Sequence, residues 1–249
     1  MIRTILVLLF IVIFLILSLP WLGIEYILGR INKPASDLRQ LHIIQRVFKI
    51  VCWLCGIKLT VIGEENVPQD EAVLYICNHR SFFDTVITYA RCPRLTGYIS
   101  KESMKKVPIF NIWMERLYCL FLNRDDVRQG LQVILTAIDQ VKNGISMCIF
   151  PEGTRNKVSD EMLPFKEGSF KIAQKAKCPI VPMAITNSSA ILEDHFPFIK
   201  STHVILEYGK PIYLDQLNKE DQKRLGSYCQ SIVNEMYEKN KSLYFSCKK

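Results

Sequence analysis

The sequence predicts an α/β protein with a mainly parallel sheet flanked by helices, preceded by an N-terminal helical pair. Beyond residue 56, short unbroken apolar runs alternate with longer segments of helical periodicity, which is typical of strands covered on both faces. The first thirty residues carry almost no charge. A chain of 249 residues, 49% of them hydrophobic, is long enough to bury a core without cross-links.

The N-terminal apolar segment predicts a membrane anchor. Residues 5–24 contain no charged side chain, and as a helix they would span about 30 Å, the thickness of a bilayer's hydrocarbon core. A cleaved signal peptide is the alternative, but no convincing small-x-small cleavage site follows. Five lysines and arginines occupy residues 30–49, against Arg3 alone before the segment. This asymmetry predicts that the bulk of the protein, which follows the segment, faces the cytoplasm.

A hinge and a second helix follow. In NKPASD, residues 32–37, we expect Pro34 to break the helix and Ser36 or Asp37 to serve as the next N-cap. The following segment has its apolar residues at helical spacing, namely Leu38, Leu41, Ile44, Val47, Phe48, Val51 and Leu54 or Cys55. Because its basic residues lie off this stripe, it predicts an amphipathic helix on the membrane or against the domain. We therefore divide the chain into a membrane-docking pair, 1–56, and an α/β domain, 57–249.

The remaining elements are predicted from the alternation of apolar runs and periodic segments. The expected strands are 58–62, 73–77, 97–100, 120–122, 145–150, 180–185 and 204–208. The expected helices are 84–90, 101–104 with 109–117, 127–143, 166–176 and 214–238. In such a fold, ligands bind where the strands deliver their C-terminal ends.

Composition restricts the partners. The formal charge of +8 and pI of about 9.0 favour anionic partners: a membrane surface, phosphorylated small molecules or an acidic carrier protein. Nucleic acid is not expected, since no dense Lys/Arg block or basic-aromatic motif occurs. The nine cysteines are dispersed within apolar runs, which indicates reduced thiols. Neither they nor the C-x-x-C at 52–55 predict a metal site.

His79 and Asp84 pose a geometric problem, because five residues on one helix turn a side chain through about 500°, or about 140° net. They can touch only if the chain changes direction between them. A strand ending near Cys77, a turn carrying His79 and a helix starting near Asp84 would achieve this. The alternative is an ordinary loop histidine followed by an aspartate that caps a helix.

Polar residues also follow the other expected strands. Lys101 and Arg124 come after two of them, and FPEGTR, residues 150–155, follows a third. The arginine side chains of Arg124 and Arg155 can each offer a bidentate fork to phosphate oxygens, and Lys101 can add a point charge.

Together these segments resemble the motifs of the glycerolipid acyltransferase family, most of all its 1-acylglycerol-3-phosphate (lysophosphatidic acid) acyltransferases. The H-x4-D motif corresponds to His79 and Asp84, and the F-x-x-R segment to Phe121 and Arg124. The F-P-E-G-T-R motif corresponds to residues 150–155, and V-P-x-x-I to residues 181–185. The resemblance covers roughly residues 55–210.

The resemblance implies transfer of a fatty acyl group from acyl-CoA or acyl carrier protein to lysophosphatidic acid, giving phosphatidic acid without a cofactor. His79 would be the general base, since a neutral imidazole with a pKa of about 6.5 suits the task, and Asp84 would fix its tautomer. The acceptor would be held by Arg124 and Arg155, with Lys101 as a weaker candidate, and by Glu152, Gly153 and Thr154. Membrane lipids are the expected surroundings.

Three alternatives stay open at this point. The family's second motif carries a glycine shortly before its phenylalanine, whereas this chain has Leu117-Tyr118-Cys119, so another lysophospholipid or lipid-linked acceptor is an alternative substrate. Cys77 lies two residues before His79 and could form an acyl-enzyme, although its apolar surroundings favour an inert core thiol. A catalytically silent, membrane-tethered lipid-binding protein is the alternative from outside the enzymes.

Overall fold

The protein is described by a computed structural model that covers residues 1–156 and 161–246. Within these residues, one sheet has the strand order β1-β7-β6-β2-β5-β3-β4. The strands are β1 Lys58–Ile62, β2 Leu74–Cys77, β3 Thr96–Lys101, β4 Leu120–Leu122, β5 Ser146–Ile149, β6 Ile180–Thr186 and β7 His203–Tyr208. The helices are α1 Ile2–Ile31, α2 Lys33–Cys55, α3 Phe83–Tyr89, α4 Phe110–Arg116, α5 Val127–Lys142, α6 Lys171–Ala176, α7 Lys219–Lys223 and α8 Leu225–Ser246.

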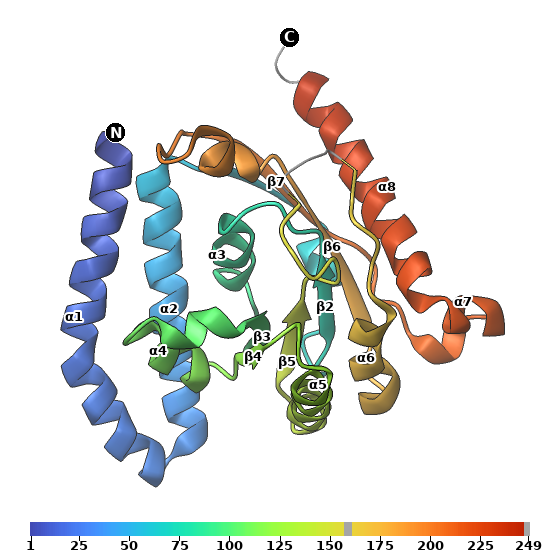
Figure 1. The fold of residues 1–249 in the computed structure, drawn as a ribbon, viewed down its shortest axis with the longest axis horizontal. Coiled ribbons are helices and arrows are strands. Elements are labelled where there is room, and N and C mark those ends of the chain that lie inside the picture. Colours follow the sequence, from blue (N-terminus) through green and yellow to red (C-terminus); the bar gives the residue numbers. More distant parts are fainter. Residues whose placement is uncertain (157–160, 247–249) are drawn as a thin grey trace.

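The sheet is parallel except where β7 meets β6, and β1 runs alongside β7 in the same direction. Helices cover both faces (Figure 1). One face packs against α1 to α4, and the other against α5, α6 and α8. In β2, Tyr75 and Cys77 belong to the first core, whereas Leu74 and Ile76 belong to the second. This alternation explains why β2 reads as an unbroken apolar run, and the predicted fold class is confirmed.

The predicted strands all occur, with boundaries within one or two residues of those expected. The predicted C-terminal helix 214–238 is wrong in its extent. Leu214–Gln216 is a separate 3-10 turn, and α7 begins only after Asn218, whose side chain accepts a hydrogen bond from the Asp221 amide at 2.8 Å. A further break at Arg224 precedes α8, which continues to Ser246. Asn218 is a capping residue whose local bond interrupts the helical pattern.

The predicted N-cap of the second helix is also wrong. The Asn32 side chain caps α2 by accepting from the Ala35 amide at 3.1 Å, and Pro34 lies in the first turn, where a missing N–H costs nothing. Ser36 and Asp37 are instead buried inside the helix. Ser36 donates to Glu25 of α1, and Asp37 pairs with Lys33 at 2.9 Å.

Helices α1 and α2 form an antiparallel hairpin along one side of the molecule (Figure 1). The buried Glu25 carboxylate of α1 accepts from the Arg39 guanidinium of α2 at 2.7 and 3.0 Å. The Trp113 indole of α4 donates to Ser18 of α1 at 3.0 Å. Helix α2 in turn contacts α3. The hairpin is thus fixed to the α/β domain by polar bonds as well as by its apolar contacts.

The outward surface of α1 is apolar between the exposed Arg3 and Arg30 near its two ends. Among the described residues it is the one helix long and apolar enough to cross a membrane. Its exposed large apolar side chains are Ile2, Ile5, Leu6, Leu8, Leu9, Val12, Ile13, Ile16, Leu17, Leu19, Ile24, Ile27 and Ile31. A surface of this kind on one side of a protein fits association with a membrane.

Candidate active site

His79 and Asp84 meet where β2 gives way to α3, as the spacing predicts. The Nδ1 atom of His79 lies 2.8 Å from Oδ2 of Asp84. The Asp84 side chain is fully buried, whereas 16% of the His79 side chain is exposed. Because Nδ1 is engaged with the carboxylate, Nε2 is the ring nitrogen left to meet a substrate.

Asp84 also begins helix α3. Its Oδ2 atom accepts hydrogen bonds from the amides of Arg80 and Ser81, each at 2.8 Å. The Ser81 hydroxyl accepts from the Phe83 amide at 3.0 Å. Ser81 and Asp84 therefore act together at the start of α3 in an arrangement similar to a capping box, since the serine accepts from the Phe83 amide and the aspartate reaches back to the Ser81 amide. Helix capping and the histidine contact, which looked like alternatives in the sequence, are performed by the same carboxylate.

The backbone of His79 is held on both sides by the segment that follows β5. The His79 amide donates to Oε1 of Glu152 at 2.7 Å, and its carbonyl accepts from the Asn156 amide at 2.8 Å. The other Glu152 oxygen accepts from the Leu163 amide at 3.0 Å. Burial raises the pKa of Glu152, while these two amide bonds oppose the shift. Glu152 therefore holds the backbone of the histidine loop in place.

The ring of His79 stacks on Phe150, with centroids 4.0 Å apart and an interplanar angle of 17°. Gly153 adopts a φ of +74°, and a Cβ there would lie 2.8 Å from the Lys166 ammonium nitrogen. The positive φ favours glycine at this turn, whereas the Lys166 contact involves the far end of a flexible side chain that can move aside. Thr154 beside it is exposed.

Asn78 connects the histidine loop to β6. Its buried side-chain amide donates to the Ile185 carbonyl at 2.9 Å and accepts from the Ile185 amide at 2.8 Å. The side chain thus continues the sheet pairing beyond the end of β2. Within β6, Pro182 pairs with Ile76, and its carbonyl accepts from Gly209 at 2.8 Å.

Arg155 is close to the histidine loop but already has partners. Its guanidinium lies 3.5 Å from the centroid of the exposed Phe82 ring and 3.2 Å from the Glu193 carboxylate. Glu193 also accepts from the Ser81 hydroxyl at 2.6 Å and from the Phe82 amide at 2.8 Å. Glu193 therefore joins the histidine loop to the arginine.

Lys101 and Arg124 lie at the same edge of the sheet, at the ends of β3 and β4. The register pairs Lys101 with Leu122, two residues before Arg124. Both side chains are exposed, and neither has a hydrogen bond or ion pair with another described residue. With strands about 4.8 Å apart, they lie roughly 10–15 Å from β2 along the edge.

Tyr118 occupies the region in which the sequence departs from the family pattern. Its φ is +61°, a left-handed conformation that glycine adopts without strain. Its hydroxyl donates to Asp37 and meets Lys33, both in α2. These bonds hold a residue whose conformation costs on the order of 1–3 kcal/mol. The backbone at this point thus keeps a glycine-like path, although the side chain differs.

Cys77 is completely buried, and burial raises the pKa of its thiol well above the ordinary range. A neutral buried thiol is a poor nucleophile, which supports the interpretation of Cys77 as an inert core residue. The cysteines in the part of the chain described here are free thiols.

Several residues at the site were not predicted from the sequence. Asn156 and Glu193 act through long-range contacts that no local pattern indicates. Asn78 adjoins His79, but nothing in the sequence pairs it with Ile185. Ser81 could have been identified, since S-x-x-D before an apolar segment is a capping signal.

The histidine–carboxylate pair at the C-terminal edge of an α/β sheet, and the motifs around it, belong to a recognisable class. Residues 58–186 match the family model described as Acyltransferase. The chain belongs to this acyltransferase family.

The names of individual relatives are more specific than that of the family. The chain is 34% identical to a 1-acyl-sn-glycerol-3-phosphate acyltransferase of Borreliella burgdorferi, over 72% of this chain and 68% of that protein. It is 28% identical to the enzyme of the same name from Saccharomyces cerevisiae, over 80% of this chain and 65% of that protein. It thus spans about two thirds of these relatives.

A solved structure has the same fold. It is the 1-acyl-sn-glycerophosphate (LPA) acyltransferase PlsC of Thermotoga maritima, with a TM-score of 0.77 and 22% sequence identity. The similarity covers 96% of this chain and 97% of that one, so it includes the N-terminal hairpin.

Proposed function

We propose that this chain is a membrane-associated acyltransferase that transfers a fatty acyl group from acyl-CoA or acyl carrier protein to lysophosphatidic acid, producing phosphatidic acid in phospholipid biosynthesis. The observation that carries the proposal is the contact of 2.8 Å between His79 Nδ1 and Asp84 Oδ2, which leaves Nε2 for the substrate. Family membership and the names of the relatives support the acceptor.

In the proposed reaction, His79 Nε2 takes the proton from the free hydroxyl of the acceptor as its oxygen attacks the thioester carbonyl. Asp84 stays ionised, holds the proton on Nδ1 and stabilises the imidazolium that forms. When the tetrahedral intermediate collapses, the carbon–sulfur bond breaks and the leaving thiolate takes the proton from Nε2. The protein is then restored without a covalent intermediate, and the buried Cys77 has no part.

The phosphate of the acceptor would bind the exposed side chains of Lys101 and Arg124, and Arg155 would add a third cation. The support is their place at one edge of the sheet and, for the first two, the lack of partners in the described part of the chain. An arginine whose N–H groups are free suits a phosphate monoester, because its planar fork can donate two parallel hydrogen bonds. Glu152, Gly153 and Thr154 would shape the turn against which the acceptor lies.

We also propose that the hairpin of α1 and α2 lies in one leaflet, with the α/β domain in the cytoplasm. Helix α1 is bonded to α2, and α2 packs on the domain through buried residues such as Leu41, Ile44 and Val51. Helix α2 also carries exposed Arg46 and Lys49. A helix tied along its length to such a partner would have to leave it to cross the bilayer, whereas lying in the interface exposes only its apolar side to lipid.

The direct test is product formation from lysophosphatidic acid with labelled acyl-CoA and, separately, with acyl carrier protein. Wild type should form phosphatidic acid, and His79→Ala should lose about 10²- to 10⁴-fold in kcat while its thermal unfolding is unchanged. His42→Ala, at an exposed histidine of α2, is the matched control. No product from folded wild type with either donor would contradict the proposed acceptor, and a wild-type rate in His79→Ala would remove the base.

A further inference from the structure

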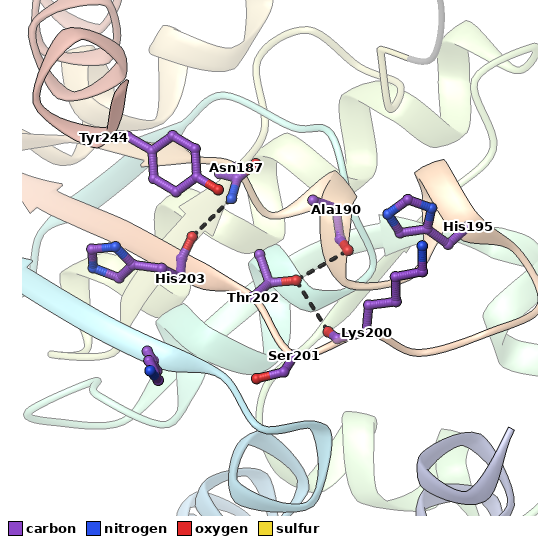
Figure 2. Close-up of a pocket in the computed structure, with 9 residues that line it drawn as sticks. Asn187, Ala190, His195, Lys200, Ser201, Thr202, His203 and Tyr244 are labelled. Carbon is purple, nitrogen blue, oxygen red and sulfur yellow. Dashed lines mark hydrogen bonds between the residues drawn. The ribbon is translucent and has the colours of Figure 1, made fainter. Parts of the chain in front are cut away.

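A cavity lies on the same edge of the sheet as His79. Because β7 runs antiparallel to β6, its first residue, His203, lies at the edge where β2, β5 and β6 end, and so does Lys58 at the start of β1. The cavity has a volume of about 370 Å³. Its lining residues are Lys58, Asn187, Ala190, His195, Lys200, Ser201, Thr202, His203 and Tyr244 (Figure 2).

The cavity is separate from the reaction centre but next to it. Strands β7 and β1 are two and three positions from β2, or about 10–15 Å along the edge. The 3-10 turn Glu193–His195 lies between the two sites. Its Glu193 side chain bonds the histidine loop, whereas its His195 side chain lines the cavity.

The lining is basic and contains no carboxylate. Figure 2 shows His195 and Lys200 at one end of the cavity and His203 and Tyr244 at the other. The side chains of Lys58, His195 and Lys200 make no hydrogen bond or ion pair with any residue that the structure describes. The two carboxylates that precede His195 in the sequence are engaged elsewhere: Glu193 with Arg155, and Asp194 with Ser189 at 3.1 Å. Two lysines that share a cavity without a counter-charge favour an anionic ligand.

The walls of the cavity are fixed by hydrogen bonds (Figure 2). The Thr202 hydroxyl donates to the carbonyls of Ala190 and Lys200, each at 3.0 Å. The Asn187 side chain donates to the His203 carbonyl at 2.9 Å, and the His203 ring meets Thr60 at 2.8 Å. The cations are therefore presented on an ordered frame.

An aromatic loop beside the cavity connects it with the N-terminal helix. Phe196 and Phe198 are 78% and 43% exposed, and they lie between the cavity residues His195 and Lys200. The next residue, Ile199, donates its amide to the Thr4 hydroxyl of α1 at 2.9 Å. Exposed phenylalanines flanked by cations, and tied to an apolar helix, are typical of a membrane contact.

We propose that this cavity binds the phosphate of an anionic phospholipid headgroup, while Phe196 and Phe198 enter the adjacent lipid. Lys58 and Lys200 supply the charge, and the hydrogen-bonded walls around Thr202 and Asn187 distinguish this site from a simple surface attraction. The phosphates of the nucleotide part of coenzyme A share the same chemistry. The lipid is the assigned occupant because the aromatic loop and α1 adjoin the cavity. The site goes beyond the proposed transfer reaction and does not depend on it.

The first experiment measures binding of the full chain to vesicles by co-sedimentation. For Lys58→Gln/Lys200→Gln, binding to phosphatidylcholine vesicles that contain phosphatidic acid should weaken about 30-fold, because each lysine near an anionic surface strengthens binding by about 5- to 6-fold. Binding to vesicles of phosphatidylcholine alone should change little. The control is Lys219→Gln/Lys223→Gln, at exposed positions of α7. An equal loss in this control would show general charge attraction and would overturn the site.

A second variant tests the cavity without changing charge. Ala190→Leu should fill part of the volume and abolish the preference for phosphatidic acid, with unchanged thermal unfolding as evidence of an intact fold. Wild-type preference in this variant would mean that the cavity is not used. If 3′,5′-ADP displaced the wild-type protein from these vesicles but had no effect on the Lys58→Gln/Lys200→Gln variant, the cavity would bind the acyl donor. That result would overturn the lipid as its occupant.

Neither readout requires turnover, so a failure of the proposed acyl transfer would leave this test intact. In detergent micelles, Lys58→Gln/Lys200→Gln should form product at the wild-type rate. A loss of turnover there would place the cavity in the reaction machinery and contradict a separate site.

Discussion

The histidine loop and the β3–β4 end of the same sheet edge are built in opposite ways. Around His79, the ring and both sides of its peptide are bonded to fixed partners, namely Asp84, Glu152 and Asn156. At the β3–β4 end, Lys101 and Arg124 are exposed and have no partner within the described residues. A proton-transfer group must be in position before the reaction, whereas a phosphate can recruit mobile cations as it binds. Arg155, which shares Glu193, lies between these extremes.

The largest expected effect comes from breaking the fixed side. In Asp84→Asn, the amide oxygen would take the place of Oδ2, because that atom also accepts from the Arg80 and Ser81 amides, so the tautomer is kept but the negative charge that stabilises the imidazolium is lost. We expect kcat to fall by about 10²- to 10⁴-fold with little change in the acceptor KM. Steady-state kinetics of the purified variant provide the measurement. A loss confined to KM would mean that Asp84 holds substrate and does not support the base.

The β3–β4 end should respond through substrate affinity. In Arg124→Ala we expect the acceptor KM to rise roughly 10- to 100-fold at nearly constant kcat, because a charge-assisted bond to phosphate is lost. Arg155→Ala should raise it less, because part of its fork is already used by Glu193.

Arg128→Ala, at an exposed arginine of α5, is the matched control for both variants. Unchanged acceptor kinetics in both arginine variants would place the phosphate elsewhere.

Glu193 bonds both the histidine loop and Arg155, so removing its side chain tests how much this link stabilises the protein. Glu193→Ala should leave the Ser81 hydroxyl, the Phe82 amide and Arg155 without their shared acceptor, and lower the free energy of unfolding by about 1.5–3 kcal/mol. Glu193→Gln should restore most of this, since an amide oxygen can still accept. Chemical denaturation measures the difference.

The matched control is Glu235→Ala, at an exposed position of α8. In a double-mutant cycle, Glu193→Ala and Arg155→Ala should be non-additive because the two side chains touch. Additive effects on stability would show that the contact between Glu193 and Arg155 contributes nothing to stability.

The smallest effect is expected at Cys77. Because its thiol is buried and its pKa is raised by burial, Cys77→Ser should keep most of the wild-type turnover. Mass spectrometry of the protein quenched during turnover should find no acyl group on this residue. A trapped thioester on Cys77 would replace direct transfer by a two-step mechanism.

Much of the frame was predictable from local patterns. Unbroken apolar runs identified the strands because both faces of the sheet are covered, and the spacing of His79 and Asp84 required a strand–turn–helix that the structure contains. Local patterns failed where a short polar side chain decided a boundary. Asn32 and Asn218 cap helices through bonds to amides three residues ahead, and these caps moved the predicted ends.

The sequence by itself determined the fold class, the histidine–carboxylate pair and the strand ends from which the candidate site residues come, because each depends on periodicity or on short spacing. Only the tertiary structure decided how they are supported. Glu193 reaches a loop more than a hundred residues earlier in the chain, Asn78 pairs with Ile185, and Lys58 shares a cavity with Lys200. Such contacts depend on which strands become neighbours, and this order is set by the packing of the whole sheet between its two layers of helices.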